Sequence, residues 1–141
     1  ILQMIWNATF VIGTRPEAIK LSPLIKKFTL SKKFKTRVIL TGQHSKIVNS
    51  VLNLFNIQID SDLKIMKHGQ SLGQMTRAII NKLEREFNDN HPNIVFVQGD
   101  TTTAFASALT AFYLKIPIAH VEAGLRTDSI YEPYPEEINR R

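Results

Sequence analysis

The sequence predicts an α/β fold in which one domain, residues 1–141, forms a doubly wound parallel sheet. Short apolar runs recur along the chain, and each is followed by a polar turn and then by a segment with the apolar spacing of a helix. The runs do not alternate between polar and apolar residues, which is typical of parallel strands covered on both faces. A chain of 141 residues, 43% hydrophobic and 21% charged, is long enough for one substantial core.

The first strand and helix are predicted near the start of the chain. An apolar run at residues 8–12 predicts the strand. Thr14 and Glu17 then have the spacing of a capping box, and Pro16 suits the first turn of a helix, so a helix should begin here. Pro23 should kink this helix or restart it.

The next two units repeat this pattern. Residues 37–40 predict the second strand, and residues 47–55 place apolar side chains on one face of a helix. Residues 57–66 are ambiguous and predict at most one short strand, near residues 63–66. Ser71 and Gln74 form a second capping-box pattern, which should start a third helix.

The central strand is predicted at residues 94–97, and Asp100 follows at its carboxyl end. A helical segment then leads to a last clear strand at residues 116–121, which ends at Glu122. The remainder of the chain is predicted to be irregular and polar. With right-handed crossovers, the favoured strand order is 3-2-1-4-5, which places the first strand beside the central one and lets Arg15 face Asp100.

This strand order gathers polar residues at the edge of the sheet where open α/β sheets bind ligands. Arg15, a planar guanidinium in the first turn of a helix, could hold a diphosphate, although a surface ion pair with Glu17 or another acid explains it equally well. Lys20 could add positive charge. Gln43 and His44 could bond a sugar or phosphate, although exposed loop residues of these types are usually solvated.

Asp100 and Glu122 should emerge from neighbouring strand ends. Two carboxylates in a partly dry cleft raise the pKa of one of them, which suits general acid and base catalysis. Two alternatives stay open at this point. Asp100 could cap the next helix, through Thr103, and Glu122 could form an ion pair with Arg126.

Several kinds of chemistry are disfavoured by what the sequence lacks. It contains no cysteine, which removes disulfides and thiolate chemistry and is consistent with a cytoplasmic protein. His120 and Glu122 would share a strand face, but no third ligand at a sensible spacing supports a metal site. Neither a G-x-G-x-x-G nor a Walker pattern indicates a bound dinucleotide or ATP, so no cofactor is expected.

The net charge of +6 favours anionic partners in general. The basic residues are scattered and do not interleave with aromatic ones, so nucleic acid is not the expected partner. No apolar run is long enough to span a bilayer, and the N-terminus lacks a signal-peptide pattern, so no membrane partner is expected. Glu136 and Glu137, in a proline-rich loop, would be solvated acids if they are taken alone.

Six short motifs follow one another in the sequence. They are GTRPEAIK at residues 13–20, TGQH at 41–44, HGQ at 68–70, GDTTT at 99–103, HVEAGLRT at 120–127 and PEEINR at 135–140. Together they closely resemble the motif set of the bacterial, non-hydrolysing UDP-N-acetylglucosamine 2-epimerases.

The resemblance implies a dimeric two-domain enzyme of the GT-B architecture, in which a UDP-sugar lies between two Rossmann-like domains. Residues 1–141 would be the N-terminal Rossmann-like domain. The C-terminal domain, which supplies uridine contacts and a catalytic histidine in this family, would be missing from the chain. The chain by itself is therefore expected to be inactive.

The resemblance also implies a reaction. The enzyme would interconvert UDP-GlcNAc and UDP-ManNAc, a precursor of cell-surface polysaccharides, by eliminating UDP and adding it back to a 2-acetamidoglucal intermediate. Asp100, Glu122 and Glu136 match the family's catalytic carboxylates. Arg15 matches its phosphate-binding arginine, and Lys20 occupies a motif position near the same cleft.

Gln43, His44 and Gln70 match motifs that line a second, allosteric UDP-GlcNAc pocket in bacterial members of the family. Two other functions stay open. One is a sibling epimerase, which either hydrolyses its substrate or acts on another UDP-2-acetamido sugar. The other is a non-catalytic module that binds UDP-sugars.

Overall fold

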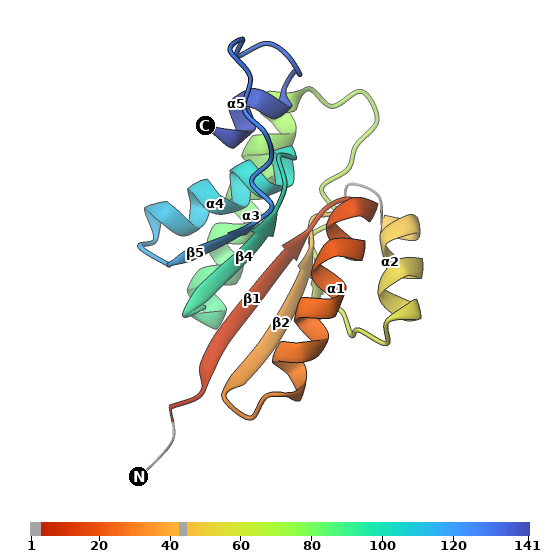
Figure 1. Ribbon diagram of the computed structural model, residues 1–141, viewed down its shortest axis with the longest axis vertical. Helices are drawn as coiled ribbons and strands as arrows, with labels where there is room; N and C mark the ends of the chain where they lie inside the picture. The colour runs from red at the N-terminus through yellow and green to blue at the C-terminus, as the bar shows by residue number, and fades with distance from the viewer. Residues whose placement is uncertain (1–3, 43–44) are drawn as a thin grey trace.

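The computed structural model describes residues 4–42 and 45–141. Figure 1 shows a sheet that runs through the middle of the molecule, with the helices packed around it. In chain order the elements are β1 (Trp6–Ile12), α1 (Arg15–Leu30), β2 (Phe34–Leu40), α2 (Ser45–Leu54), β3 (Ser61–Asp62), α3 (Leu72–Asn90), β4 (Ile94–Gln98), α4 (Thr102–Tyr113), β5 (Ile118–Val121) and α5 (Glu136–Arg140).

The strands form one parallel sheet in the order β3-β2-β1-β4-β5, which confirms the predicted order. β1 lies at the centre, where Phe10 is opposite Val38 of β2 on one side and Phe96 of β4 on the other. Because the strands are parallel, their carboxyl ends meet at one edge of the sheet. The strand order reverses between β1 and β4, which is where ligands bind in sheets of this type.

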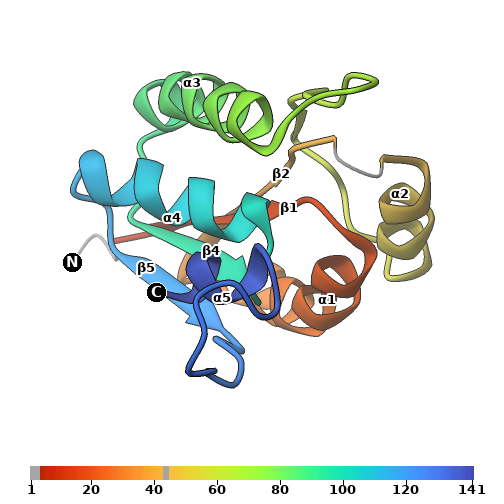
Figure 2. The ribbon, with the colours of Figure 1, turned by 90° about the horizontal axis from the view of Figure 1, so that it is seen from above.

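Helices cover both faces of the sheet, as Figure 2 shows. α1 and α2 pack together on one face, and α3 and α4 pack together on the other. Each face has its own apolar core. In the first core Phe10 stacks on Phe96 with ring centroids 4.5 Å apart, and in the second Ile79 and Leu83 of α3 are fully buried. The predicted α/β fold, a doubly wound and Rossmann-like sheet, is therefore confirmed.

α1 begins where the sequence predicts. Thr14 is its N-cap residue, and the carboxylate of Glu17 accepts the N–H groups of Gly13 and Thr14 at 2.7 and 2.5 Å. Of the two effects expected of Pro23, the restart is wrong, because the helix continues through it. Pro23 and Ile19, the residue four positions earlier, are both exposed, so water can reach the carbonyl that the proline leaves without a partner.

The short strand β3 precedes the residues predicted to form it. Leu63 and Ile65 are buried, as their apolar character suggests, but they lie beyond the strand. Their N–H groups bond to carbonyl groups at the end of β2, at 2.8 and 3.0 Å. Lys64, between them, has φ 49°, which interrupts the extended backbone. Burial of the apolar side chains was therefore predictable, and the strand boundaries were not.

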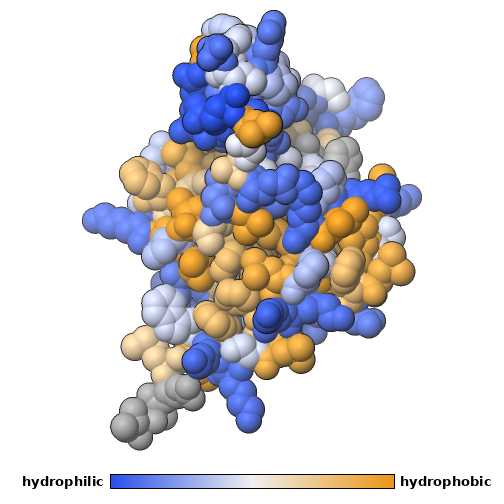
Figure 3. All heavy atoms as spheres, viewed as in Figure 1, coloured by the Kyte–Doolittle hydropathy of each residue, from blue (hydrophilic) through white to orange (hydrophobic). Residues whose placement is uncertain are grey.

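The segment after β5 is less irregular than predicted, because it ends in the short helix α5, which packs against α4. The five residues of α5, EEINR, are too few and too charged to show a helical hydrophobic period. Figure 3 shows that the end of the molecule near α5 is hydrophilic, whereas apolar residues gather over the middle of the same face. The polar residues of this end surround the carboxyl edge of the sheet.

Candidate functional site

A cleft of about 590 Å³ opens at the carboxyl edge of the sheet, beside the point where the strand order reverses. Its walls come from the start of α1, the end of β4, the segment after β5 and helix α5. Three of the predicted site residues, Lys20, Asp100 and Glu122, line it together. The other lining residues are Thr14, Pro16, Gln98, Gly99, Thr101, Gly124, Leu125 and Arg140.

Glu122 is held between a lysine and a glutamine. Lys20 Nζ donates to Glu122 Oε1 at 2.5 Å, and Gln98 Nε2 donates to Glu122 Oε2 at 3.3 Å. The hydrogen bond from Lys20 lowers the pKa of Glu122 below its ordinary value of 4.5, against a smaller effect of burial. The expected upward shift is therefore wrong for Glu122, because its close charged neighbour is a cation. The alternative ion pair with Arg126 is also wrong, because Arg126 pairs with Glu137.

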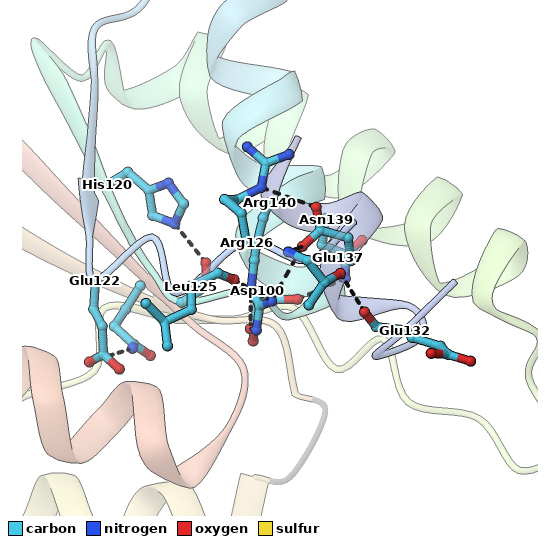
Figure 4. Close-up of polar contacts among 12 residues, drawn as sticks. Asp100, His120, Glu122, Leu125, Arg126, Glu132, Glu137, Asn139 and Arg140 are labelled. Carbon is cyan, nitrogen blue, oxygen red and sulfur yellow. Dashed lines mark hydrogen bonds and ion pairs between the residues drawn. The ribbon is translucent and has the colours of Figure 1, made fainter. Parts of the chain in front are cut away.

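Asp100 is held by two residues of α5, as Figure 4 shows. Arg140 donates to Asp100 Oδ2 from Nε at 2.9 Å and from Nη2 at 2.5 Å, and Asn139 Nδ2 donates to the Asp100 carbonyl at 2.8 Å. The alternative in which Asp100 caps α4 is wrong. The cap is Thr101, whose Oγ1 accepts the N–H of Ala104 at 3.0 Å. The Asp100 carboxylate therefore does not cap α4; it pairs with Arg140 and lines the cleft.

Glu137 is not the solvated acid that the sequence suggested, because its side chain is 0% exposed. Arg126 Nε and Arg141 Nε each lie 3.1 Å from its Oε1, and Arg140 Nη1 lies 3.5 Å from its Oε2. Burial by itself would raise the pKa of Glu137. Hydrogen bonds from Arg141, Arg126 and the main chain of Thr127 outweigh burial and lower this pKa to about 2.

The two sides of the cleft are joined beneath it by Glu17, which is buried. Its Oε1 accepts the hydroxyl of Thr101 at 2.5 Å, while its Oε2 accepts N–H groups from the turn after β1. Burial raises the pKa of Glu17, and these hydrogen bonds offset part of the rise. Because this carboxylate is engaged in the interior, the alternative ion pair between Arg15 and Glu17 is wrong.

The remaining predicted site residues are placed differently. Arg15 is exposed at the first position of α1, between two residues that line the cleft, and its side chain has no hydrogen bond or ion pair within the described residues. Glu136 begins α5, and its Oε2 is buried without a hydrogen-bond partner in the described part of the chain. Gln70 lines a separate groove of about 530 Å³ along α3. Gln43 and His44 lie outside the described residues.

Two kinds of feature are absent from residues 4–42 and 45–141. No group of three or more histidine, aspartate or glutamate side chains in these ranges is placed to hold a metal ion. His120 instead contacts the carbonyl of Gly99, with its Nε2 2.6 Å from that oxygen. Nor does any helix in these ranges combine the length and the apolar character that crossing a membrane requires.

Sequence reasoning missed three residues that shape the cleft, namely Gln98, Arg140 and Glu137. The only signal for Gln98 was a polar side chain at the end of an otherwise apolar strand. Arg140 and Glu137 lie in a charged segment that has no apolar pattern, so their burial and pairing depend on contacts with distant residues.

The cleft combines groups that can transfer protons with groups that can balance negative charge. Asp100 and Glu122 are carboxylates on its wall, and Lys20 lies beside them on α1. The nearby first turn of α1 adds the partial positive charge of a helix N-terminus. This arrangement suits acid and base chemistry on an anionic ligand.

The chain is similar to known proteins over almost its whole length. The sequence profile of the family described as UDP-N-acetylglucosamine 2-epimerase matches residues 26–141. A UDP-N-acetylglucosamine 2-epimerase from Neisseria meningitidis is 50% identical over 131 residues, which make up 93% of this chain and 35% of the relative. One from Campylobacter jejuni is 50% identical over 138 residues, which make up 98% of this chain and 36% of the relative.

Solved structures have the same fold. The UDP-GlcNAc 2-epimerase from Neisseria meningitidis bound to UDP-GlcNAc matches with a TM-score of 0.91 and 49% identity, over 96% of this chain and 37% of that one. The Methanocaldococcus jannaschii UDP-GlcNAc 2-epimerase in complex with UDP-GlcNAc and UDP matches with a TM-score of 0.87 and 36% identity, over 95% of this chain and 36% of that one. The chain therefore spans about a third of the length of these relatives.

Proposed function

This chain belongs to the UDP-N-acetylglucosamine 2-epimerase family, and from that premise we propose that it forms the N-terminal, nucleotide-sugar-binding part of a two-domain isomerase with GT-B architecture. The proposed enzyme interconverts UDP-GlcNAc and UDP-ManNAc without hydrolysing them. The observation that carries the proposal is the cleft in which Lys20, Asp100 and Glu122 meet at the carboxyl edge of the sheet.

The chemical problem in this reaction is that the hydrogen on C2 of the sugar is barely acidic. Elimination solves it. A carboxylate takes the C2 proton, the C1–O bond breaks with its electron pair leaving on UDP, and a double bond forms between C1 and C2 of a 2-acetamidoglucal. UDP then adds back to C1 while a proton is delivered to the opposite face of C2. Substrate and product have the same oxidation state, so the scheme requires no redox cofactor.

The three candidate carboxylates have different surroundings, which supports different roles. Glu122 is held by Lys20 and Gln98, and its pKa lies below the ordinary value of 4.5. It is an anion at neutral pH and can accept a proton, with less driving force than an unpaired glutamate. Asp100 is fixed through one oxygen by Arg140. Glu136 begins α5 and has one buried oxygen without a partner among the described residues.

Positive charge on one side of the cleft would stabilise the departing diphosphate. Lys20 lines the cleft, and Arg15 lies at the first position of α1 with its side chain unpaired among the described residues. We assign both to the phosphates. The second domain of the proposed enzyme would supply the uridine contacts.

A regulatory site belongs to the same proposal. Gln70 lines a groove with the basic side chains of Lys67 and Arg77, which suits an anionic ligand. We assign Gln70, with Gln43 and His44, to binding of a second UDP-GlcNAc molecule. Homodimer formation, a cytoplasmic location and inactivity of the chain by itself stay predictions.

The test of the proposed function uses a full-length protein that carries this chain. Incubation with UDP-GlcNAc should give UDP-ManNAc, identified by NMR of the sugar protons, with deuterium entering at C2 in heavy water. Asp100→Asn should lower kcat by about 100-fold or more while UDP binding persists. Free ManNAc as the product would indicate the hydrolysing enzyme, and binding without turnover would indicate a non-catalytic module. Near-normal turnover by Asp100→Asn would remove Asp100 from catalysis.

Arg15 is tested by binding. Arg15→Ala should weaken UDP binding by about 2 kcal/mol, because a charged hydrogen-bonded contact to phosphate is lost. Isothermal titration calorimetry measures the difference. Lys26→Ala, which removes an exposed cation from α1 outside the cleft, is the matched control and should leave the affinity unchanged. Equal affinities for all three proteins would place Arg15 outside the site.

A further inference from the structure

Glu137 is the buried centre of a charged network that the proposed chemistry does not use. Its side chain is 0% exposed and pairs with Arg126, Arg140 and Arg141. Its Oε2 also accepts the N–H of Thr127 at 3.2 Å. A charge buried in this way must be paired. Of the three partners, Arg140 is largely buried, with its side chain 13% exposed, whereas those of Arg126 and Arg141 are 54% and 42% exposed. The placement of Arg140 therefore depends on Glu137 the most.

Arg140 connects this network to the cleft. Its Nε and Nη2 donate to Asp100 Oδ2, and its Nη1 donates to the carbonyl of Leu125 at 2.7 Å. Within the described residues no hydrogen bond reaches Asp100 Oδ1, so Arg140 fixes one carboxylate oxygen and leaves the other to a ligand. The side chain of Arg140 is only 13% exposed, so water can replace few of these contacts. Figure 4 shows Arg140 with these partners.

The segment after β5 is shaped around the same guanidinium group. Gly124 has φ 84°, and a Cβ atom at this position would lie 2.9 Å from Arg140 Nε. Only glycine adopts this positive φ without strain and leaves room for the Arg140 side chain. The Leu125 carbonyl and the Thr127 N–H are then bonded to Arg140 and to its buried carboxylate partner. The network therefore fixes the segment that begins at Glu122.

We propose that Glu137 is a positioning residue for epimerisation, an inference that rests on the proposed function. Glu137 does not touch the substrate. Through Arg140 it holds Asp100, and through Arg126 it holds the segment that carries Glu122. Two carboxylates from different strand ends thereby keep one arrangement around the reacting carbon, where a shift of about 1 Å costs about 100-fold in rate.

The first test replaces Glu137 by glutamine in a full-length protein that carries this chain. Glu137→Gln keeps the shape of the side chain and removes its charge. We expect kcat with UDP-GlcNAc to fall by about tenfold or more and KM to change by less than about threefold, because the carboxylates move while the phosphate contacts remain. A folded Glu137→Gln enzyme with wild-type kcat overturns the proposal.

The matched control is Glu132→Gln. Glu132 is exposed in the same segment, and its carboxylate has no hydrogen bond or ion pair among the described residues. Its replacement should leave kcat and KM unchanged. If Glu137→Gln does not fold, Glu137→Asp serves as the second variant, because it keeps the charge and shortens the reach. Glu137→Asp should also lower kcat, by a smaller factor than we expect for Glu137→Gln. An unchanged kcat in Glu137→Asp overturns the proposal.

A double-mutant cycle tests whether Glu137 acts through Arg140. Arg140→Lys keeps the positive charge but removes the two donors, Nε and Nη2, that bond to Asp100. If the two residues act as one unit, the double variant with Glu137→Gln should be slower than the worse single variant by less than about twofold. Effects on kcat that multiply independently overturn the proposal.

A measurement that needs no turnover separates this inference from the proposed function. In NMR spectra of the chain, the Nε–H of Arg140 should exchange slowly with water, because it is bonded to Asp100 and largely buried. Glu137→Gln should speed that exchange by about tenfold or more, and Glu132→Gln should not. An unchanged exchange rate of the Arg140 Nε–H in Glu137→Gln would rule out the positioning role. If instead the wild-type full-length protein does not epimerise UDP-GlcNAc, the proposed function is wrong.

Discussion

Lys20 and Glu122, 102 residues apart in the chain, meet at 2.5 Å across the candidate site. Their side chains are 44% and 52% exposed, so solvent screens the attraction and the pair contributes little to the free energy of unfolding. The main effect of this ion pair is on the protonation of Glu122. The hydrogen bond from Lys20 lowers the pKa of Glu122, so this carboxylate is protonated only in more acidic solution than an ordinary glutamate.

We predict that Lys20→Met raises the pKa of Glu122 toward its ordinary value of 4.5, because the dominant cause of the downward shift is removed. A titration of the labelled side-chain carboxyl carbon by NMR measures this. Lys26→Met, which removes an exposed lysine from the same helix, should leave the titration of Glu122 unaltered. An identical Glu122 pKa in Lys20→Met would show that another group controls it.

At the level of elements, the ends of β1, β2 and α4 converge on Gly13. A Cβ atom on Gly13 would lie 2.1 Å from Thr103 Oγ1 and 2.9 Å from Thr41 Oγ1. These two hydroxyl oxygens are themselves 3.1 Å apart, and both side chains are fully buried. The absence of a side chain at Gly13 therefore permits the close packing beneath the cleft.

Gly13→Ala should lower the free energy of unfolding by about 1–3 kcal/mol, because the added methyl group cannot fit without displacing buried atoms. Urea denaturation measures the loss. Gly73→Ala is the matched control, because a Cβ atom on Gly73 in α3 would meet nothing closer than 4.0 Å. That substitution should stabilise the chain by up to about 1 kcal/mol through helix propensity. Equal stability of the two variants would contradict this account of Gly13.

Over the whole molecule, protonation of partnered carboxylates governs stability in acid. The pKa values of Glu86, Glu122 and Glu137 lie below the ordinary value of 4.5, and that of Glu137 is about 2. A carboxylate with a lowered pKa stabilises the folded state above its unfolded pKa and loses this contribution as the pH falls through its folded pKa. Burial raises the pKa of Glu17, so protonation of Glu17 has the opposite effect and increases the free energy of unfolding of the protein.

The raised pKa of Glu17 confines its effect to pH values above about 4.5, whereas the contribution of Glu137 is lost between 4.5 and about 2. We therefore expect the free energy of unfolding to decrease as the pH falls from 4.5 toward 2. Urea denaturation at a series of pH values tests this. The net charge of +6 would add repulsion in acid, which salt screens. The decrease should therefore persist in about 0.5 M salt, where the Debye length is only a few ångströms. A stability that is flat through this window, or flat only in salt, would contradict the assignment.

Much of the fold could be predicted because its signals are local. The apolar runs that became β1, β2 and β4 and the capping pattern at Ser71 were visible as single short segments. Handedness and burial on both faces then restricted the strand order. A restart of the helix at Pro23 and the bounds of β3 were predicted wrongly, because solvent exposure of one carbonyl and a positive φ at Lys64 are not encoded in apolar spacing.

The candidate site was predictable only in part. Asp100 and Glu122 follow strand ends, and Lys20 lies in the second turn of α1, so the topology gathers them at one edge. Their partners could not be predicted in the same way. Arg140 and Glu137 pair with groups up to 40 residues away, and each would be an ordinary surface charge if α5 packed elsewhere.

Residue order alone determined the α/β class, the strand order and the edge at which polar residues collect, because these depend on periodicity and on the chirality of the chain. Only the tertiary structure decided which charges meet. It set Lys20 against Glu122 and Arg140 against Asp100, and it buried Glu137 while its neighbour Glu136 stayed partly exposed. Protonation depends on distance and on access of water, and both quantities exist only once the chain has folded.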